Sequence, residues 1–408
     1  MQTIDEFARG TEHLEDRAHL AERLAKGDHL RIKFGVDPTA PDIHLGHTVP
    51  MRRLRSWQES GHLPVIIIGD WTARIGDPSG RSETRPPLSA EEVEANAQTY
   101  LDQLFLILDR ERTEVRRQTE WFDRMGLADV LRLCAARTVQ QILQRADFTE
   151  RMRSERAVGI HELLYPLLQG YDSVAVDADL EIGGTDQLFN LLAARQIQQW
   201  YGKPAQDVAT LPLIPGLDGV RKMSKSYGNY IGIAEPPEEQ YGKAMSIPDE
   251  LIVRYLQLAT NVPAPEVDEW ARRLQADEVN PRDAKAFLAR AIVGEFHGEE
   301  AARRAEQAFR HVHGGGGVPA SIRRVPLARP GQSKVVDVFR EAFAGTKDER
   351  SKSEIRRLSL SGGLKVIDPG GNAYAPRIED GAETMKTEPG TVLSIGKRAF
   401  VELIAPQP

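Results

Sequence analysis

Residues 64–68 read Pro64-Val65-Ile66-Ile67-Ile68 and are followed directly by Gly69. A continuous run of β-branched residues that ends at a glycine predicts a strand buried on both faces. Both faces of a strand are covered mainly in parallel sheets, where helices pack on either side. The run therefore points to an α/β fold.

The flanking sequence alternates short apolar runs with amphipathic segments. Further strands are expected at residues 30–36, 173–176, 180–182 and 208–214. Ser89 and Glu92 form a capping-box pattern, which predicts a helix whose apolar face carries Val93, Ala97, Leu104 and Leu108. A second helix is expected to carry Val130, Leu133, Cys134 and Ile142. Strands that alternate with helices indicate a parallel α/β sheet.

Glycine-rich, charged segments follow the predicted strands, at residues 35–46, 69–85, 183–187 and 216–226. Ligands of an open parallel sheet bind in the crevice beyond the carboxyl ends of its strands. The four segments are therefore expected to meet at a nucleotide site.

The pattern changes along the second half of the chain. We expect a catalytic α/β domain at 1–235, a helical domain at 236–320, a glycine- and proline-rich linker at 321–335 and a small α+β module at 336–404. In the module, a helix is expected at 353–358 and a strand at 364–367. A hairpin with strands at 392–395 and 399–404 should follow.

Composition limits the class of protein. Charged residues make up 28% and hydrophobic residues 40% of the 408, as in globular proteins, and the net charge of −7 argues against a generic nucleic-acid coat and a DNA partner. No apolar run approaches the ~20 residues of a membrane span, and the N-terminus lacks a signal-peptide core, so a cytoplasmic location is expected. Cys134 is the single cysteine, which excludes an internal disulfide and a cysteine-cluster zinc site; no metal-ligand set is predicted.

The motif His44-Leu45-Gly46-His47 follows a strand and opens a helix. A helix N-terminus favours phosphate, Gly46 permits close approach of a flat base, and His44 and His47 share one face from which they can donate hydrogen bonds. The loop Lys222-Met223-Ser224-Lys225-Ser226 carries two lysines that can neutralise a departing pyrophosphate. The usual phosphate-loop and dinucleotide motifs are absent. Together the two motifs predict ATP-driven activation of a carboxylic acid.

The pair resembles the H-I-G-H and K-M-S-K-S signatures of the class I aminoacyl-tRNA synthetases. The resemblance implies a Rossmann-like domain, ATP with Mg²⁺ as substrate, no bound organic cofactor, and transfer of the activated acid to tRNA. It assigns catalysis to Thr39, His44, His47, Lys222 and Lys225, and ATP binding also to Gly46, Asp186 and Ser224.

Tyr165, Gln169 and Asp172 are spaced four and three residues apart, which places them on one helical face. With Gly183-Gly184-Thr185-Asp186-Gln187 and Gly76-Asp77-Pro78-Ser79-Gly80, this face is similar to bacterial tyrosyl-tRNA synthetases. The similarity implies tRNA(Tyr), tyrosine and ATP as partners, and a homodimer formed near residues 100–165. It assigns the substrate ammonium to Asp77, Tyr165 and Gln169, the phenol hydroxyl to Asp172, and further substrate contacts to Asp37 and Gln187. A site built to hydrogen-bond a hydroxyl rejects phenylalanine. This rule is drawn from enzymes of this kind.

Lys33 departs from that similarity, because many relatives carry a pocket tyrosine at this position. Its side chain is expected either to point into the pocket near Asp172 or to reach solvent. A distinct bacterial subgroup lacks the tyrosine, and the chain resembles that subgroup.

The module after Gln332 resembles a small RNA-binding domain named after a ribosomal small-subunit protein. The resemblance implies that basic side chains contact tRNA phosphates, namely Lys352, Arg356, Arg357, Lys397 and Arg398.

Two alternative functions stay open. A tryptophan-specific enzyme shares the fold and both signatures, but typically lacks the C-terminal module and does not explain the Tyr165, Gln169 and Asp172 set. An idle paralogue kept as an RNA-binding protein is disfavoured by the intact histidines and lysines of the two motifs.

Overall fold

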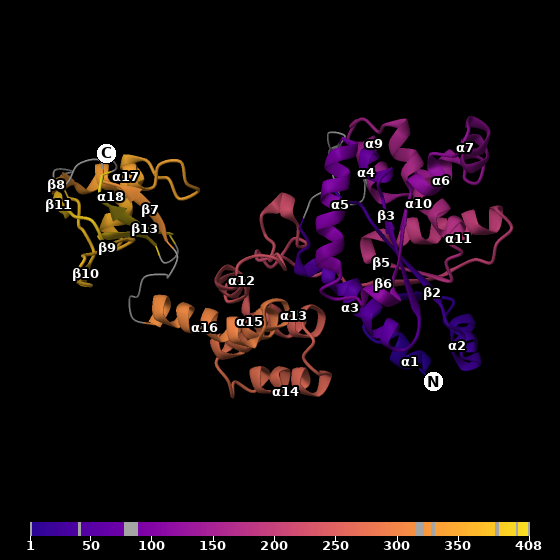
Figure 1. Ribbon diagram of the computed structural model, residues 1–408, viewed down its shortest axis with the longest axis horizontal. Helices are drawn as coiled ribbons and strands as arrows, with labels where there is room; N and C mark the ends of the chain where they lie inside the picture. The colour runs from indigo at the N-terminus through magenta and orange to yellow at the C-terminus, as the bar shows by residue number, and fades with distance from the viewer. Residues whose placement is uncertain are drawn as a thin grey trace. The chain divides into compact units, whose positions relative to one another are not determined.

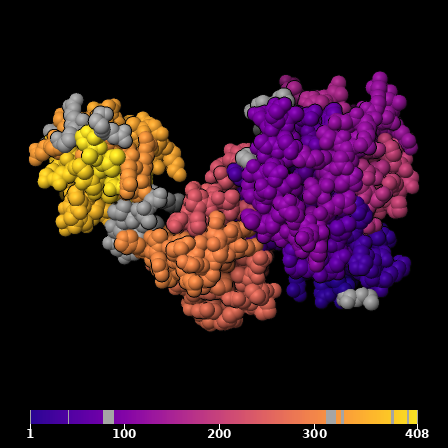
Figure 2. Space-filling model, in the orientation of Figure 1, coloured from indigo at the N-terminus to yellow at the C-terminus, as the bar shows by residue number. Residues whose placement is uncertain are grey.

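The computed structural model describes residues 2–39, 42–76, 89–314, 322–327, 331–379, 383–396 and 399–406. The chain divides into two compact units, Met1–Gly298 and Glu299–Pro408 (Figure 1). Figure 2 shows one face of the two units as a space-filling surface. Among the described residues, none of the helices combines the length and apolarity that crossing a lipid bilayer requires.

The first unit is built on a six-stranded sheet with the order β1-β6-β5-β2-β3-β4. Its strands are β1 His13–Glu15, β2 Arg31–Val36, β3 Leu63–Ile68, β4 Glu114–Arg117, β5 Leu180–Gly184 and β6 Asp207–Leu211. β1 runs antiparallel to β6, and the other neighbours are parallel. The chain adds β3 and β4 on one side of β2 and then β5 and β6 on the other, so a crevice opens beyond the carboxyl ends of β2 and β5. The predicted parallel α/β sheet is confirmed.

Helices connect and cover these strands. They are α1 Ile4–Phe7, α2 Arg17–Lys26, α3 Leu45–Glu59, α4 Thr72–Ile75, α5 Ala90–Leu104, α6 Thr119–Phe122, α7 Leu127–Cys134, α8 Val139–Ile142, α9 Ala146–Arg153, α10 Ile160–Ala175 and α11 Leu188–Trp200. α12 Pro237–Ala244, α13 Ile252–Ala259, α14 Ala264–Gln275 and α15 Pro281–His297 then form the expected helical region. The capping box at Ser89 starts α5 as predicted.

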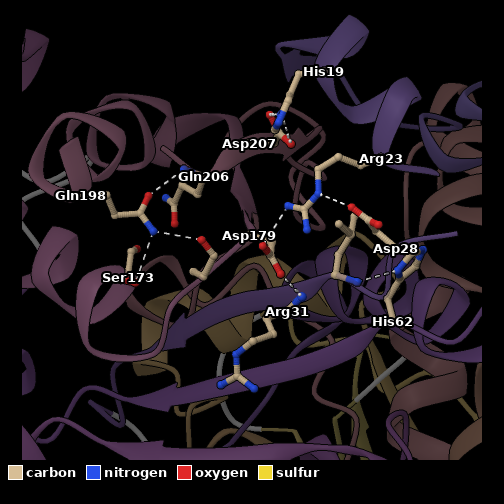
Figure 3. Close-up of polar contacts among 12 residues, drawn as sticks. His19, Arg23, Asp28, Arg31, His62, Ser173, Asp179, Gln198, Gln206 and Asp207 are labelled. Carbon is tan, nitrogen blue, oxygen red and sulfur yellow. Dashed lines mark hydrogen bonds and ion pairs between the residues drawn. The ribbon is translucent and has the colours of Figure 1, made fainter. Parts of the chain in front are cut away.

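β3 and the N-terminal segment show how the sheet is held. Val65 and Ile67 belong to a buried apolar cluster, against which Leu168 and Tyr171 of α10 pack. Asp179 lies just before the first residue of β5 and accepts a hydrogen bond from Arg23 of α2 at 2.8 Å (Figure 3). The sheet is therefore held by apolar packing along its strands and by an ion pair at their amino ends.

Three predictions about the first unit were wrong or incomplete. Residues 173–176 end α10 instead of forming a strand, since a short apolar run fits either element and here continues a helical face. The single helix expected around residues 130–142 is two, because Thr138 caps a new helix, α8, after α7 ends. β4 was missed because its sequence Glu-Val-Arg-Arg is charged, as edge strands often are.

The second unit contains α16 Glu299–Gly314, β7 Arg323–Pro326, β8 Gly331–Lys334, α17 Val335–Ala342, α18 Lys352–Leu360, β9 Leu364–Ile367, β10 Ala373–Tyr374, β11 Thr384–Thr387, β12 Val392–Ile395 and β13 Ala399–Ile404. Its main sheet has the order β10-β9-β12-β13-β7, and β8 pairs with β11. Phe339, Ile355 and Leu393 are fully buried in its core. The predicted module helix, strand and hairpin are confirmed.

The linker predicted at 321–335 was partly wrong. β7 pairs in parallel with β13, and β8 pairs with β11, so both strands belong to the module. Glycine and proline concealed them, because edge strands tolerate these residues where central strands do not.

Candidate active site

A cavity of about 620 Å³ opens at the carboxyl ends of β2, β3, β5 and β6. Its lining includes residues that follow these strands within two positions, namely Asp37, Gly69, Asp186 and Pro212. Described parts of all four predicted glycine-rich segments contribute, so their convergence is confirmed. Other residues predicted from the sequence line the same cavity, among them Thr39, Gly46, Gln187 and Ser224.

Asp37 is held between two hydroxyl groups. Tyr165 donates to its Oδ2 at 2.8 Å, and Thr72 donates to its Oδ1 at 2.6 Å. A Cβ on Gly69 would lie 2.1 Å from Asp37 Oδ1, so only glycine fits beside the carboxylate. The fixed negative charge faces the cavity and suits a cationic group such as an ammonium. Thr72 was not predicted, and Asp77 lies outside the described residues.

Asp172 is buried in the cavity wall with 2% of its surface exposed. Gln118 Nε2 donates to Oδ2 at 2.9 Å, and Trp121 Nε1 donates to Oδ1 at 3.2 Å. Burial raises the pKa of Asp172 to about 7, because it penalises the charged form. Each oxygen keeps a lone pair that can accept a further hydroxyl from the cavity. Gln118 and Trp121 were missed, because they follow the unrecognised strand β4.

Lys33 does not reach solvent. Its side chain is fully buried and forms an ion pair with Glu181 at 2.9 Å. Gln169, which lines the cavity, donates from Nε2 to the same Glu181 carboxylate at 3.1 Å. The alternative of an exposed lysine is thus excluded, and Lys33 lies behind the polar face of α10 rather than among the residues that line the cavity.

His44 and His47 stack at the start of α3, with ring centroids 3.7 Å apart. Burial lowers the pKa of His47 to about 4, and burial together with the neighbouring His47 lowers the pKa of His44 well below its usual range. Both rings are therefore neutral near pH 7. A Cβ on Gly46 would lie 3.0 Å from the His44 ring, which explains the glycine between the histidines.

The loop with the two lysines is fixed through its middle. Met223 is buried and its N–H donates to Ile214 O at 3.0 Å, while Asn229 Oδ1 accepts from Ser224 N at 2.8 Å. Lys222 Nζ lies 2.7 Å from Asp186 Oδ2, and Lys225 Nζ lies 3.3 Å from Asp42 Oδ2.

Both lysines thus point at carboxylates beside the cavity. These contacts are exposed or half-exposed, and exposed ion pairs contribute little stability, so an arriving polyphosphate could take over the lysines.

In the second unit, Lys352, Arg356 and Arg357 lie exposed on α18. Lys352 Nζ lies 2.9 Å from Asp337 Oδ1, whereas no ion pair is found for the two arginines among the described residues. Lys397 and Arg398 lie outside the described residues.

Comparisons with known proteins identify the family. The family described as tRNA synthetases class I (W and Y) matches residues 25–314. A Tyrosine--tRNA ligase of Thermotoga maritima is 48% identical, over 94% of this chain and 92% of its own. A Tyrosine--tRNA ligase of Oleidesulfovibrio alaskensis is 46% identical, over 99% of this chain and 98% of its own.

Solved structures share the fold. A tyrosyl-tRNA synthetase from Archaeoglobus fulgidus, complexed with L-tyrosine, superimposes with a TM-score of 0.61 at 23% identity, over 74% of this chain and 98% of its own. A tryptophanyl-tRNA synthetase from Plasmodium falciparum gives 0.57 at 17% identity, over 75% of this chain and 85% of its own. At these identities the structural likeness bears on the fold and does not separate the two amino acids.

Proposed function

The chain belongs to the tRNA synthetases class I (W and Y), and from this premise we propose that it is a tyrosine–tRNA ligase. One observation carries the choice of tyrosine. The buried Asp172, held by Gln118 and Trp121, offers an acceptor in the cavity for a phenol hydroxyl. Full-length similarity to ligases named for tyrosine supports the same choice.

The reaction has two steps. A carboxylate oxygen of tyrosine attacks the α-phosphorus of ATP, and the bond to pyrophosphate breaks. A ribose hydroxyl of the terminal adenosine of tRNA then attacks the tyrosyl carbonyl, and AMP leaves with the bonding electrons.

The side chains of the cavity divide this work. Asp37, Tyr165 and Gln169, with Asp77, would hold the ammonium, while Asp172 would accept the phenol hydroxyl. Asp186 would meet the ribose, and Gln187 and Thr39 would contact the amino acid and the phosphates.

The phosphate end is separate. Neutral His44 and His47 would donate hydrogen bonds to the α-phosphate as its charge grows, and the backbone at Gly46 would leave room for the adenine. Lys222 and Lys225, with the Ser224 loop, would neutralise pyrophosphate. Mg²⁺ would arrive bound to the ATP phosphates.

Amino-acid-dependent exchange of pyrophosphate into ATP tests the proposal. We expect efficient exchange with tyrosine, far weaker exchange with phenylalanine and none above background with tryptophan. Exchange with tryptophan but not tyrosine would establish the tryptophan-specific alternative. A purified wild-type chain without exchange for any amino acid would favour an idle RNA-binding paralogue.

The C-terminal module fits a role in tRNA binding. Arg356 and Arg357 are exposed on one helix, where they can reach phosphates. Lys352, Lys397 and Arg398 would complete the basic surface. Since its substrates are tRNA, tyrosine and ATP, the enzyme would act in the cytoplasm.

We also propose a homodimer formed by the segment near residues 100–165. Large exposed apolar side chains concentrate there, at Leu106, Leu127, Leu131, Val139, Met152 and Ile160. Such a concentration is typical of a surface that another protein covers. The helices α7 to α9 all lie within this segment.

Leu131→Glu tests this surface, because a charge at an apolar interface is costly to desolvate. We expect sedimentation to show a dimer for the wild type and a weakened dimer, with a dissociation constant raised about tenfold or more, for the variant. Leu360→Glu, at an equally exposed leucine of α18, is the matched control and should stay dimeric. A wild-type monomer at micromolar concentration would disprove the dimer.

A further inference from the structure

Lys33 and Glu181 form a buried ion pair inside the sheet. They are direct partners in the register of β2 and β5, and their side chains are 0% and 1% exposed. A buried pair costs desolvation energy and is commonly no more stable than apolar residues of the same volume. Packing alone therefore gives little reason for these two charges.

Every polar group of the pair is satisfied. Lys33 Nζ donates to Glu181, to Gln169 O at 2.6 Å and to Ser173 Oγ at 2.9 Å. The Glu181 carboxylate also accepts from Gln169, Ser173 and Gln206, the last at 2.5 Å. The lysine has used all three of its hydrogens, so its position is fully determined.

The surroundings of the pair are also held by hydrogen bonds. Gln198 of α11 donates to Ser173 O and Ala178 O and accepts from Gln206 N (Figure 3). Gln198 therefore links Ser173 of α10 with Gln206, which precedes β6. The side chains of these two residues both donate to the Glu181 carboxylate. The result is a polar frame that joins α10, α11, β5 and the start of β6.

This frame meets the cavity at two points. Glu181 itself lines the cavity and holds the Gln169 side chain through its carboxylate. Asp172, one residue before Ser173, also lines it. Burial is the main influence on the pKa of Asp172; among the described residues, the charge of Lys33 lowers that pKa and the charge of Glu181 raises it.

We propose that Lys33 is a positioning residue for tyrosine selectivity: among the described residues it is the cation that pairs with the buried Glu181, and its charge compensates two neighbouring buried carboxylates, Glu181 and Asp172. Glu181 can then orient Gln169, and Asp172 can accept the phenol hydroxyl. The inference rests on the proposed tyrosine activation. It assigns to Lys33 a role through charge, not through contact with the substrate.

The charge can be separated from the hydrogen bonds by two substitutions. Lys33→Met leaves two buried carboxylates without a cation, so one of them takes up a proton. Lys33→Met/Glu181→Gln removes more hydrogen bonds but leaves Asp172 as the single charge, and the new amide oxygen can still accept from Gln169. A purely structural role predicts that the double variant is at least as defective as the single one.

We expect Lys33→Met to lower the ratio of kcat/KM for tyrosine to that for phenylalanine at pH 7.5 by about tenfold or more, the size of effect expected when a hydrogen bond to a charged group is lost. The KM for ATP should stay within about twofold. The double variant should recover most of the ratio. No recovery, or an unchanged ratio in Lys33→Met, would overturn the role of Lys33.

Arg151→Met is the control. It breaks the buried Arg151–Glu162 pair, whose residues do not line the cavity, and should lower stability without changing the ratio. If Lys33→Met does not fold, Glu181→Gln and the double variant decide the matter: equal ratios support a role through charge, and a much lower ratio in the double variant contradicts it. Wild-type protein without tyrosine-dependent exchange would instead refute the proposed function.

Discussion

Asp172→Asn should lower the preference for tyrosine over phenylalanine by about a hundredfold, because a buried, charge-assisted hydrogen bond contributes ~1.5–3 kcal/mol. Gln118 Nε2 and Trp121 Nε1 each donate to one oxygen of Asp172. An asparagine amide offers one oxygen and one NH₂ group, so one of these donors would face another donor. Tyrosine would lose the acceptor for its hydroxyl, or the cavity wall would lose the hydrogen bonds that order it. Phenylalanine has no hydroxyl, so it would lose no hydrogen bond.

The measurement is kcat/KM for both amino acids in pyrophosphate exchange. Asp207→Asn is a matched control, because Asp207 is also buried but accepts from His19 at 3.2 Å and does not line the cavity. It should leave the ratio within about threefold of wild type. A wild-type ratio in Asp172→Asn would remove Asp172 from the hydroxyl site.

The same residue gives the ratio a pH dependence. Burial raises the pKa of Asp172 to about 7, so the carboxyl is neutral at pH 6 and ionised at pH 8. We expect the wild-type ratio to rise between these values, and Asp172→Asn to be flat. Titration of His44 and His47 should not contribute to this change between pH 6 and 8, because burial lowers their pKa values below that range.

The fold and the site are predictable from the sequence where one segment carries its own signal. The strand at Val65 to Ile68 is apolar throughout, and the spacing of Tyr165, Gln169 and Asp172 is legible within one helix. Each property depends on local periodicity, which the sequence displays directly.

Residues whose partner lies on another element are not predictable in this way. Gln118 is recognisable as a site residue only once β4 is known to be a strand, and β4 is a charged edge. Lys33 alone suggested a pocket or solvent, because nothing in the sequence aligns it with Glu181, more than a hundred residues away. Strand register, not composition, makes that lysine a buried partner.

Lys225→Ala should slow tyrosine activation by about 10²–10³-fold, the usual cost of removing one group that stabilises charge in a transition state. Lys225 Nζ lies 3.3 Å from Asp42 Oδ2 on a loop that Met223 and Asn229 hold against the fold. Its charge would be needed most when the pyrophosphate bond breaks, so the dissociation constant of tyrosine should stay within about twofold.

Single-turnover formation of the adenylate and equilibrium binding of tyrosine separate these two effects. Lys203→Ala is the control, because Lys203 also pairs with an aspartate, Asp177, but does not line the cavity. It should leave both quantities unchanged. Equal losses in rate and tyrosine binding for Lys225→Ala would mean that the lysine shapes the pocket, whereas a loss in rate alone assigns its charge to the departing pyrophosphate.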